Sequence, residues 1–309
     1  MARVVPYLFL SVLQLVFVSG VLGATFTISN NCEHTVWPGL LSGAGTSPLP
    51  TTGFPLQKGE SRSISAPTNW SGRIWGRTQC AEDSTGKFTC VTGDCGSGKM
   101  ECAGGGALPA TLAEFTLDGS GGLDFYDVSL VDGYNLPMVV VPQGGSGNCT
   151  TTGCVVELNG ACPSELRVAA AAGGGGESVA CRSACEAFNA PEYCCSGAYA
   201  TPDTCKPSAY SEFFKHACPR AYSYAYDDST STFTCAAADY AITFCPNFSS
   251  KKSAATGEGN GRPEAVQPPL VNASMIFTGM EYASDAASRG GAYSRLLAIS
   301  AWALLAYYS

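Results

Sequence analysis

Histidine is scarce in this 309-residue chain, which contains only His34 and His216. Two imidazoles are too few for a histidine-based metal cage, and a Ser-His-Asp hydrolase would have to use one of them. Charged residues are also few, at 14% of the chain, and 17 Lys and Arg stand against 25 Asp and Glu, a net charge of −8. Because no basic run can neutralise a phosphate backbone, nucleic-acid binding is disfavoured.

The N-terminus has the pattern of a secretory signal. Residues 1–23 contain one charged residue, Arg3, followed by an apolar stretch and a small-residue cleavage site before Ala24. This order of features predicts a signal peptide that is removed. An uncleaved membrane anchor is the alternative, and it is disfavoured because Ser19 and Gly20 interrupt the apolar segment.

The C-terminal segment, residues 296–309, is apolar and uncharged, but its 14 residues are fewer than the ~20 of a membrane-spanning helix. It follows a polar spacer and a triplet of small residues that begins at Ser284. This arrangement predicts a GPI-attachment signal, residues 285–309, which is removed when the lipid is attached at Ser284 or a neighbouring residue. A vacuolar or merely apolar tail is the alternative. Residues 24–284 then carry 14 basic and 24 acidic side chains, a net charge of −10.

All 16 cysteines lie between the two processing segments. An even number of cysteines in a secreted chain predicts a set of disulfides with no free thiol. Zinc is the rival explanation, but the chain lacks a paired Cys-x-x-Cys set, and adjacent Cys194 and Cys195 suit two different bridges better than one tetrahedral site. No metal site is therefore expected, and the spacing alone leaves the disulfide pairing open.

Short strand-like runs bounded by glycine and proline predict an antiparallel β-sandwich or barrel. These runs are residues 24–30, 34–38, 62–64, 73–77, 87–91, 111–117, 123–130, 138–141, 222–234 and 240–246. Cysteine becomes dense at residues 149–218, which indicates a disulfide-stapled insert with two short helices, residues 183–188 and 208–216. At about 150 residues per domain, the length allows one large domain with such an insert.

No cysteine follows Cys245. Residues 247–284 contain a stretch rich in Ser, Ala, Gly, Lys, Glu and Pro that cannot bury much surface, which predicts a flexible stalk. Four sequons predict surface glycans, at Asn69, Asn148, Asn247 and Asn272.

Residues 86–102, GKFTCVTGDCGSGKMEC, resemble the signature of the thaumatin-like proteins, the plant pathogenesis-related family 5. Further blocks in family order extend the resemblance over residues 24–246, among them GRIWGR at 72–77, DFYDVS at 124–129 and ITFCP at 242–246. The resemblance implies a mainly β fold, a flattened antiparallel sandwich with a disulfide-rich loop and short-helix insert. No cofactor is expected. The tail after Pro246 resembles the membrane-anchored long forms of the family.

Matching the cysteines to the family in order also implies a pairing. The implied pairs are Cys32–Cys245, Cys80–Cys90, Cys95–Cys102, Cys149–Cys235, Cys154–Cys218, Cys162–Cys181, Cys185–Cys194 and Cys195–Cys205.

The resemblance further implies a cleft between the sandwich and the insert, lined by acidic residues in antifungal members. The matching positions are Arg73, Glu114, Asp127, Asp132 and Asp227, with Asp228 an adjacent candidate for the last. Taken without the family, Asp124 and Asp127 are better explained as turn formers at strand ends, and Glu114 with Arg73 as a structural ion pair. Since Asp127 and Asp132 are five positions apart, the turn at Gly133 has to bring them to one face.

Converging carboxylates can accept hydrogen bonds from sugar hydroxyls, or can hydrolyse a glycosidic bond if one is protonated and another ionised. The expected function is that of a secreted, monomeric defence protein that binds β-1,3-glucan or another fungal wall polysaccharide, tethered by a lipid to the outer face of the plasma membrane. One alternative is a weak endo-β-1,3-glucanase with Glu114 as the acid and Asp127 or Asp132 as the base. The other is a non-enzymatic extracellular interaction module in development.

Overall fold

The computed structural model describes residues 23–170 and 178–246. The predicted stalk, the GPI-attachment signal and all of the signal peptide except Gly23 lie outside these residues, as do the sequons at Asn247 and Asn272. The other two sequon asparagines, Asn69 and Asn148, are exposed. Within the described ranges no helix combines the length and the apolar character needed to cross a membrane.

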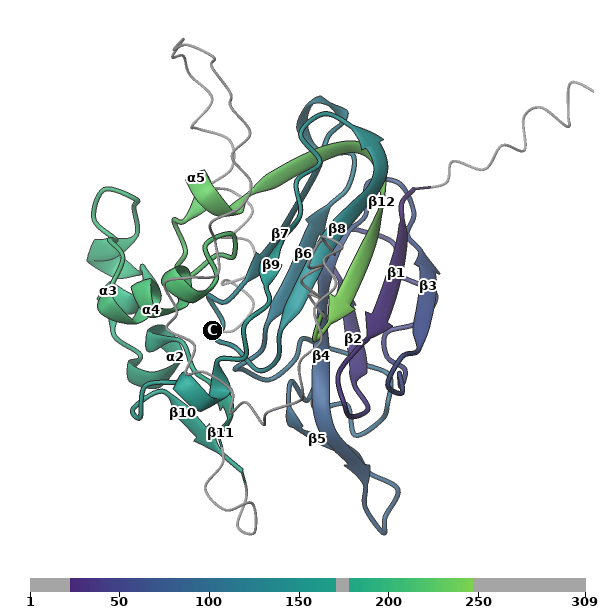
Figure 1. The fold of residues 1–309 in the computed structure, drawn as a ribbon, viewed down its shortest axis with the longest axis horizontal. Coiled ribbons are helices and arrows are strands. Elements are labelled where there is room, and N and C mark those ends of the chain that lie inside the picture. The colour runs from purple at the N-terminus through teal and green to yellow at the C-terminus, as the bar shows by residue number, and fades with distance from the viewer. Residues whose placement is uncertain (1–22, 171–177, 247–309) are drawn as a thin grey trace, which may run out of the picture. The chain divides into compact units, whose positions relative to one another are not determined.

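The strands form a curled sheet whose two halves face each other as the layers of a sandwich (Figure 1). One layer consists, in hydrogen-bonded order, of β2 (Trp37–Ser42), β4 (Ser71–Glu82), β6 (Leu112–Thr116) and β7 (Asp124–Ser129). The other contains β3 (Ser61–Ser65), β1 (Thr25–Asn30), β12 (Phe233–Phe244), β8 (Met138–Ser146) and β9 (Thr152–Cys154). These pairings are antiparallel except that β1 runs parallel to β12.

The last strand, β12, belongs to both layers. Its residues 233–235 pair with β7, whereas residues 236–244 pair with β8. Between these two stretches Ala237 has a φ of 52°, a left-handed backbone that is uncommon for a residue with a side chain. The sequence predicted two strands here, at residues 222–234 and 240–246. The first prediction was wrong over its initial residues, which form a turn and α5 (Asp228–Ser231) because local side chains bond within the turn.

Five aromatic side chains fill the space between the layers. Phe26 of β1, Phe115 of β6, Tyr126 of β7, Tyr240 of β12 and Trp70 before β4 are each at most 3% exposed. Contacting rings have centroids 4.7–6.4 Å apart. Each such ring removes roughly 150–250 Å² from water, so this cluster is a principal source of stability. It also fixes which face of β4, β6 and β7 points inward and which points out.

The insert contains short helices and a two-stranded hairpin that lie to one side of the strands (Figure 1). Its elements are η2 (Asn159–Ala161), β10 (Arg167–Ala169), β11 (Ser178–Cys181), α2 (Ala184–Phe188), α3 (Pro191–Cys194), η3 (Gly197–Tyr199) and α4 (Ala209–Ala217); η1 (Ser120–Gly122) precedes β7 in the sandwich. The two predicted helices correspond to α2 and α4. Ser183 and Ser208 cap them by accepting backbone N–H bonds, which is why they begin there.

All sixteen cysteines are paired, and the pairs are those that the family resemblance implies. Cys32–Cys245 has the largest sequence separation, 213 residues. It lies just beyond the ends of β1 and β12, where the register places Asn30 opposite Phe244. This disulfide therefore ties the first strand to the last.

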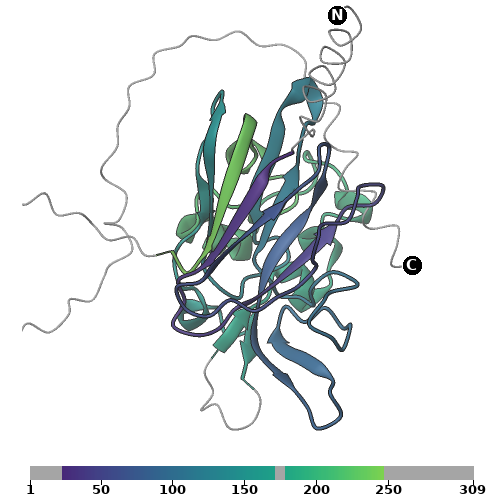
Figure 2. The same cartoon turned by 90° about the vertical axis from the view of Figure 1, so that its right-hand side faces the viewer.

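The family signature, residues 86–102, forms β5 (Phe88–Thr92) and the loop that follows it. The hairpin of β4 and β5 projects from one end of the sandwich (Figures 1 and 2). Within the loop the Asp94 carboxylate accepts backbone N–H bonds from Cys90 at 2.6 Å and Gly96 at 2.7 Å. Asp94 thus anchors the turn.

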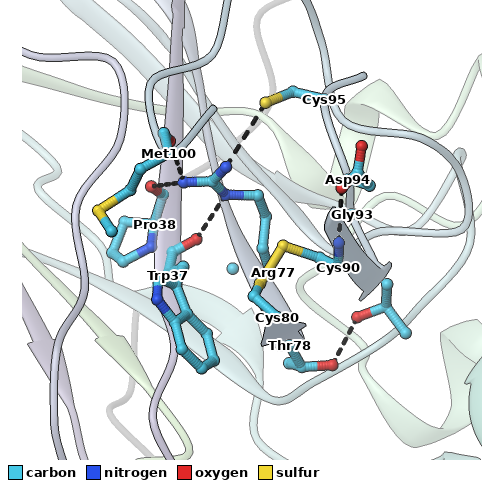
Figure 3. Close-up of a disulfide and its surroundings, with 12 residues drawn as sticks. Trp37, Pro38, Arg77, Thr78, Cys80, Cys90, Gly93, Asp94, Cys95 and Met100 are labelled. Atoms are coloured by element: carbon cyan, nitrogen blue, oxygen red, sulfur yellow. Dashed lines mark hydrogen bonds between the residues drawn. A yellow bond between two sulfur atoms is a disulfide. The ribbon is translucent and has the colours of Figure 1, made fainter. Parts of the chain in front are cut away.

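Arg77 on β4 joins this hairpin to the neighbouring segments. Its side chain is fully buried, and Nε donates to the Trp37 carbonyl at 3.0 Å. Nη2 donates to the carbonyls of Met100 at 2.7 Å and Pro38 at 3.3 Å (Figure 3). The guanidinium also lies 5.4 Å from the centre of the Phe88 ring. One cation therefore holds together β2, β4, β5 and the loop at Met100.

Candidate functional site

Three residues of the predicted acidic set occupy one row across three adjacent strands. Arg73 of β4 is in register with Glu114 of β6, which is in register with Asp127 of β7. Side chains at the same register share a face, and cross-strand neighbours have Cβ atoms about 4.5–5.5 Å apart. The chain neighbours Phe115 and Tyr126 point into the core, so the row lies on the opposite face of the layer, where all three side chains are half-buried. Strand register thus brings together residues that are far apart in sequence.

Asp132 reaches the same region through a turn. The Gly133 N–H donates to the Leu130 carbonyl at 3.0 Å, and Gly133 has a φ of 87°. A Cβ on Gly133 would clash with Pro109 and come within 2.7 Å of the Cys181 carbonyl oxygen, so only glycine fits this turn. We call Arg73, Glu114, Asp127 and Asp132 together the acidic cluster.

Burial and crowding keep the carboxyl groups of the cluster from ionising easily. Burial raises the pKa of Glu114 to about 7, Asp132 raises it further and Arg73 partly opposes both effects. Burial and the charge of Glu114 also raise the pKa of Asp127 well above its ordinary value. Burial raises the pKa of Asp132, and Arg73 opposes the shift. Near neutral pH the cluster can therefore hold protonated and ionised carboxyls side by side. Glycoside hydrolysis uses such a mixture, and sugar binding is compatible with it.

These shifts predict a pH dependence of stability. Folded Glu114 holds its proton up to about pH 7, whereas the unfolded value is 4.5, so between these pH values the folded state binds more protons. The stability contributed by the protonated carboxyl is therefore complete below pH 4.5 and is lost as pH rises to about 7, a loss of about 3 kcal/mol. We expect Glu114→Gln to flatten this slope and to be more stable than wild type at pH 7.5.

Guanidinium unfolding at pH 4.5 and pH 7.5 measures this effect, with Glu82→Gln as the matched control because Glu82 is exposed on the same strand as Arg73. An unchanged slope in Glu114→Gln would show that Glu114 ionises normally in the folded protein.

Asp227 and Asp228 have different surroundings. The Asp227 carboxylate is buried, pairs with Lys215 Nζ at 2.8 Å and accepts hydrogen bonds from the Ser223 backbone N–H and the hydroxyls of Ser223 and Thr230. Its oxygens are thus occupied by contacts with the adjoining turn, with α5 and with Lys215 of α4. Asp228 is exposed, and its charge contributes to the raised pKa of Asp127. Of the two candidates, Asp228 is the one with an accessible carboxylate near the cluster.

The insert adds two charged residues that the sequence reasoning missed, Arg182 and Glu186. Burial raises the pKa of Glu186 to about 7, Arg182 opposes the shift and the charge of Asp132 adds to it. Glu186 therefore lies within electrostatic range of the acidic cluster. Nothing in the sequence signals this, because a glutamate in a five-residue helix has the pattern of an ordinary surface residue.

A small hollow lies mostly within the insert, and Val131 at the end of the sandwich forms part of its edge. Its lining includes Val131, Cys185 and Phe214 but none of the acidic cluster. Val131 and Cys185 directly precede Asp132 and Glu186, so the hollow adjoins the segments that carry these two residues. Among the residues that the structure covers, no three His, Cys, Asp or Glu side chains are arranged to hold a metal ion.

The curled β-sandwich, the eight disulfides and the insert of short helices place this chain in the class of disulfide-rich β proteins. The model of the thaumatin family matches residues 30–246, and the chain therefore belongs to the thaumatin family. Members of its pathogenesis-related 5 group are generally extracellular.

Three relatives illustrate this membership. Thaumatin-like protein 1 of Arabidopsis thaliana is 60% identical over 253 residues, covering 79% of this chain and 93% of that protein. Pathogenesis-related protein 5 of the same plant is 56% identical over 238 residues, covering 76% and 97%. A glucan endo-1,3-beta-glucosidase of Prunus avium is 52% identical over 248 residues, covering 80% and 100%.

Proposed function

We propose that this protein is a secreted plant defence protein that binds β-1,3-glucan of fungal walls through the acidic cluster. The observation that carries the proposal is the register row of Arg73, Glu114 and Asp127, with Asp132 beside it. The Asp127 Oδ1 atom is buried and has no hydrogen-bond partner within the described part of the chain, so it is an unsatisfied acceptor that a bound hydroxyl would pair. The relative named glucan endo-1,3-beta-glucosidase supports the choice of polysaccharide.

Two predicted segments outside the described residues belong to the same proposal. The signal peptide would deliver the protein to the cell exterior, and lipid attachment at or near Ser284 would hold it on the plasma membrane. Residues 24–284 carry a net charge of −10. This charge favours binding of a neutral polysaccharide over binding of a polyanion.

Sedimentation with insoluble β-1,3-glucan tests the binding. We expect the purified 24–284 chain to be retained on the pellet and Asp132→Ala to lose about tenfold in affinity, because a hydrogen bond to a charged group contributes about 1.5–3 kcal/mol. Asp203→Ala is the control, since Asp203 is exposed and lies in the insert. Absence of wild-type retention, in a protein shown to be folded, would overturn the proposal and direct the search to protein partners.

Hydrolysis of the bound glucan is the second candidate, and the raised pKa of Glu114, about 7, specifically favours it. A carboxyl that stays protonated near neutral pH can act as general acid, with an ionised neighbour as base or nucleophile. Glu114→Gln separates the two functions, because the amide can still form hydrogen bonds but cannot donate a proton to a leaving group. Release of reducing ends that falls at least a hundredfold in Glu114→Gln, with retention intact, would make the protein an enzyme. Retention without release leaves a binding protein.

A further inference from the structure

The insert is fixed directly against the turn that carries Asp132. The backbone N–H and C=O groups of Tyr134 and Cys181 form two hydrogen bonds of 2.8 Å with each other. Gly133, next to Asp132, packs so closely that a Cβ there would lie 3.2 Å from the Ser183 backbone nitrogen. The chain from Cys181 into α2 therefore starts at the edge of the acidic cluster, and its position relative to Asp132 is fixed by main-chain contacts.

Local structure then holds Glu186 in place on this chain. The Ser183 hydroxyl accepts the Glu186 backbone N–H at 3.2 Å, which sets the first turn of α2. Glu186 is half-buried, and the charged groups that act on it are Asp132 from the sandwich and Arg182 from the insert. Two carboxyls thus lie on opposite sides of the junction between sandwich and insert, Asp132 on one and Glu186 on the other.

Both insert residues have a polar atom without a partner. Glu186 Oε2 and Arg182 Nε are buried and form no hydrogen bond within the described residues, and the same holds for Asp127 Oδ1 across the junction. Buried polar atoms in folded proteins are nearly always paired, so unpaired acceptors on both sides of the junction and an unpaired donor on the insert side point to a polar ligand. The Arg182 guanidinium does not form an ion pair with the Glu186 carboxyl, because the two groups are not within salt-bridge distance of each other.

We propose that Glu186 is a sugar-contacting residue on the insert side of the glucan site, where its carboxyl accepts a hydrogen bond from a hydroxyl of the bound chain and Arg182 Nε donates one. The proposal rests on the proposed function. A glucan has many hydroxyls, and each can donate and accept a hydrogen bond. Such hydroxyls match a site whose insert side offers the acceptor Glu186 and the donor Arg182, and whose sandwich side offers the carboxyls of the acidic cluster. A sugar chain held between the two walls would be oriented as well as bound.

Titration with a linear β-1,3-linked glucose hexasaccharide at pH 5.5 tests the role of Glu186. We expect Glu186→Ala to weaken affinity about tenfold and Glu186→Gln to stay within twofold of wild type, because the amide keeps an acceptor where the protonated carboxyl has one. Arg182→Lys, which keeps the charge but has no Nε donor, should also weaken binding. Glu212→Gln, exposed on α4 of the insert, is the control and should not change affinity.

Stability separates a ligand-contacting role from a structural one. Since Glu186 Oε2 bonds to nothing in the described protein, Glu186→Ala should unfold at the same denaturant concentration as wild type or at a higher one. Unchanged affinity in Glu186→Ala, with Asp132→Ala weakened, would overturn this inference and leave the proposed function standing. A lower unfolding midpoint with unchanged affinity would show that Glu186 stabilises the fold and does not contact the ligand. Absence of hexasaccharide binding by the folded wild type would overturn both proposals.

Discussion

Replacing Arg77 by methionine is expected to lower the free energy of unfolding by about 3–5 kcal/mol, because it leaves three carbonyls without their donor and each unsatisfied buried group costs about 1–3 kcal/mol. Methionine can fill much of the space, but it offers no donor to the carbonyls of Trp37, Pro38 and Met100, which Arg77 now satisfies. Burial lowers the pKa of Arg77 to about 10, with Asp94 and Glu101 opposing the shift, so the guanidinium is still charged at neutral pH.

Guanidinium unfolding of Arg77→Met at pH 7 measures the loss, and Arg62→Met is the matched control. Arg62 also lies over an aromatic ring, with Cζ 4.5 Å from the centre of Phe54, but its side chain is exposed. We expect the control to lose less than about 1 kcal/mol. A similar loss in both variants would show that the ring contact, and not the buried hydrogen bonds, is what Arg77 contributes.

We expect Arg77→Met to change the surroundings of the acidic cluster as well. Arg77 holds the backbone at Met100, and the loop after it passes directly over Arg73, since a Cβ on Gly105 would clash with the Arg73 guanidinium. A loop released at Met100 would leave Arg73 free to move. The Arg73 charge lowers the pKa values of Glu114 and Asp132, so its position sets which carboxyl in the cluster carries the proton.

Alternation and local chemistry were enough to predict much of the sandwich. In β1 the apolar Phe26 and Ile28 alternate with Thr and Ser, and the structure buries those two side chains completely. The helix starts at Ser183 and Ser208 were predictable because a serine cap is a local signal. The disulfide pairing needed the family, since spacing alone leaves it open.

The acidic cluster was predictable only in part, because its geometry depends on contacts between distant residues. Resemblance pointed to Glu114 and Asp127, but their alignment arises from the register of β6 with β7, which the sequence alone does not specify. The contact of Asp227 with Lys215 and the approach of Glu186 to Asp132 depend on how the insert docks. No periodicity or local motif encodes that docking.

The Cys32–Cys245 disulfide carries the other large expected effect. Replacing both cysteines by alanine leaves no unpaired thiol, because their only bond is with each other. In the chain-entropy model the stabilisation grows with the length of the closed loop. Cys149–Cys235, Cys80–Cys90 and Cys95–Cys102 already shorten the path between the two ends, so the effective loop is roughly 110 residues and the expected loss about 4–5 kcal/mol.

The double alanine variant of Cys80 and Cys90 is the natural comparison. That disulfide closes a separation of 10 residues within one hairpin, where the two cysteines are also register partners, and its removal should cost about 2–3 kcal/mol. Non-reducing guanidinium unfolding followed by tryptophan fluorescence gives both values. Equal losses would show that local strain or packing, and not loop closure, accounts for the stabilisation. A larger loss for Cys32–Cys245 would agree with loop closure, since this disulfide joins the ends of β1 and β12, whose parallel pairing brings the two ends of the domain together.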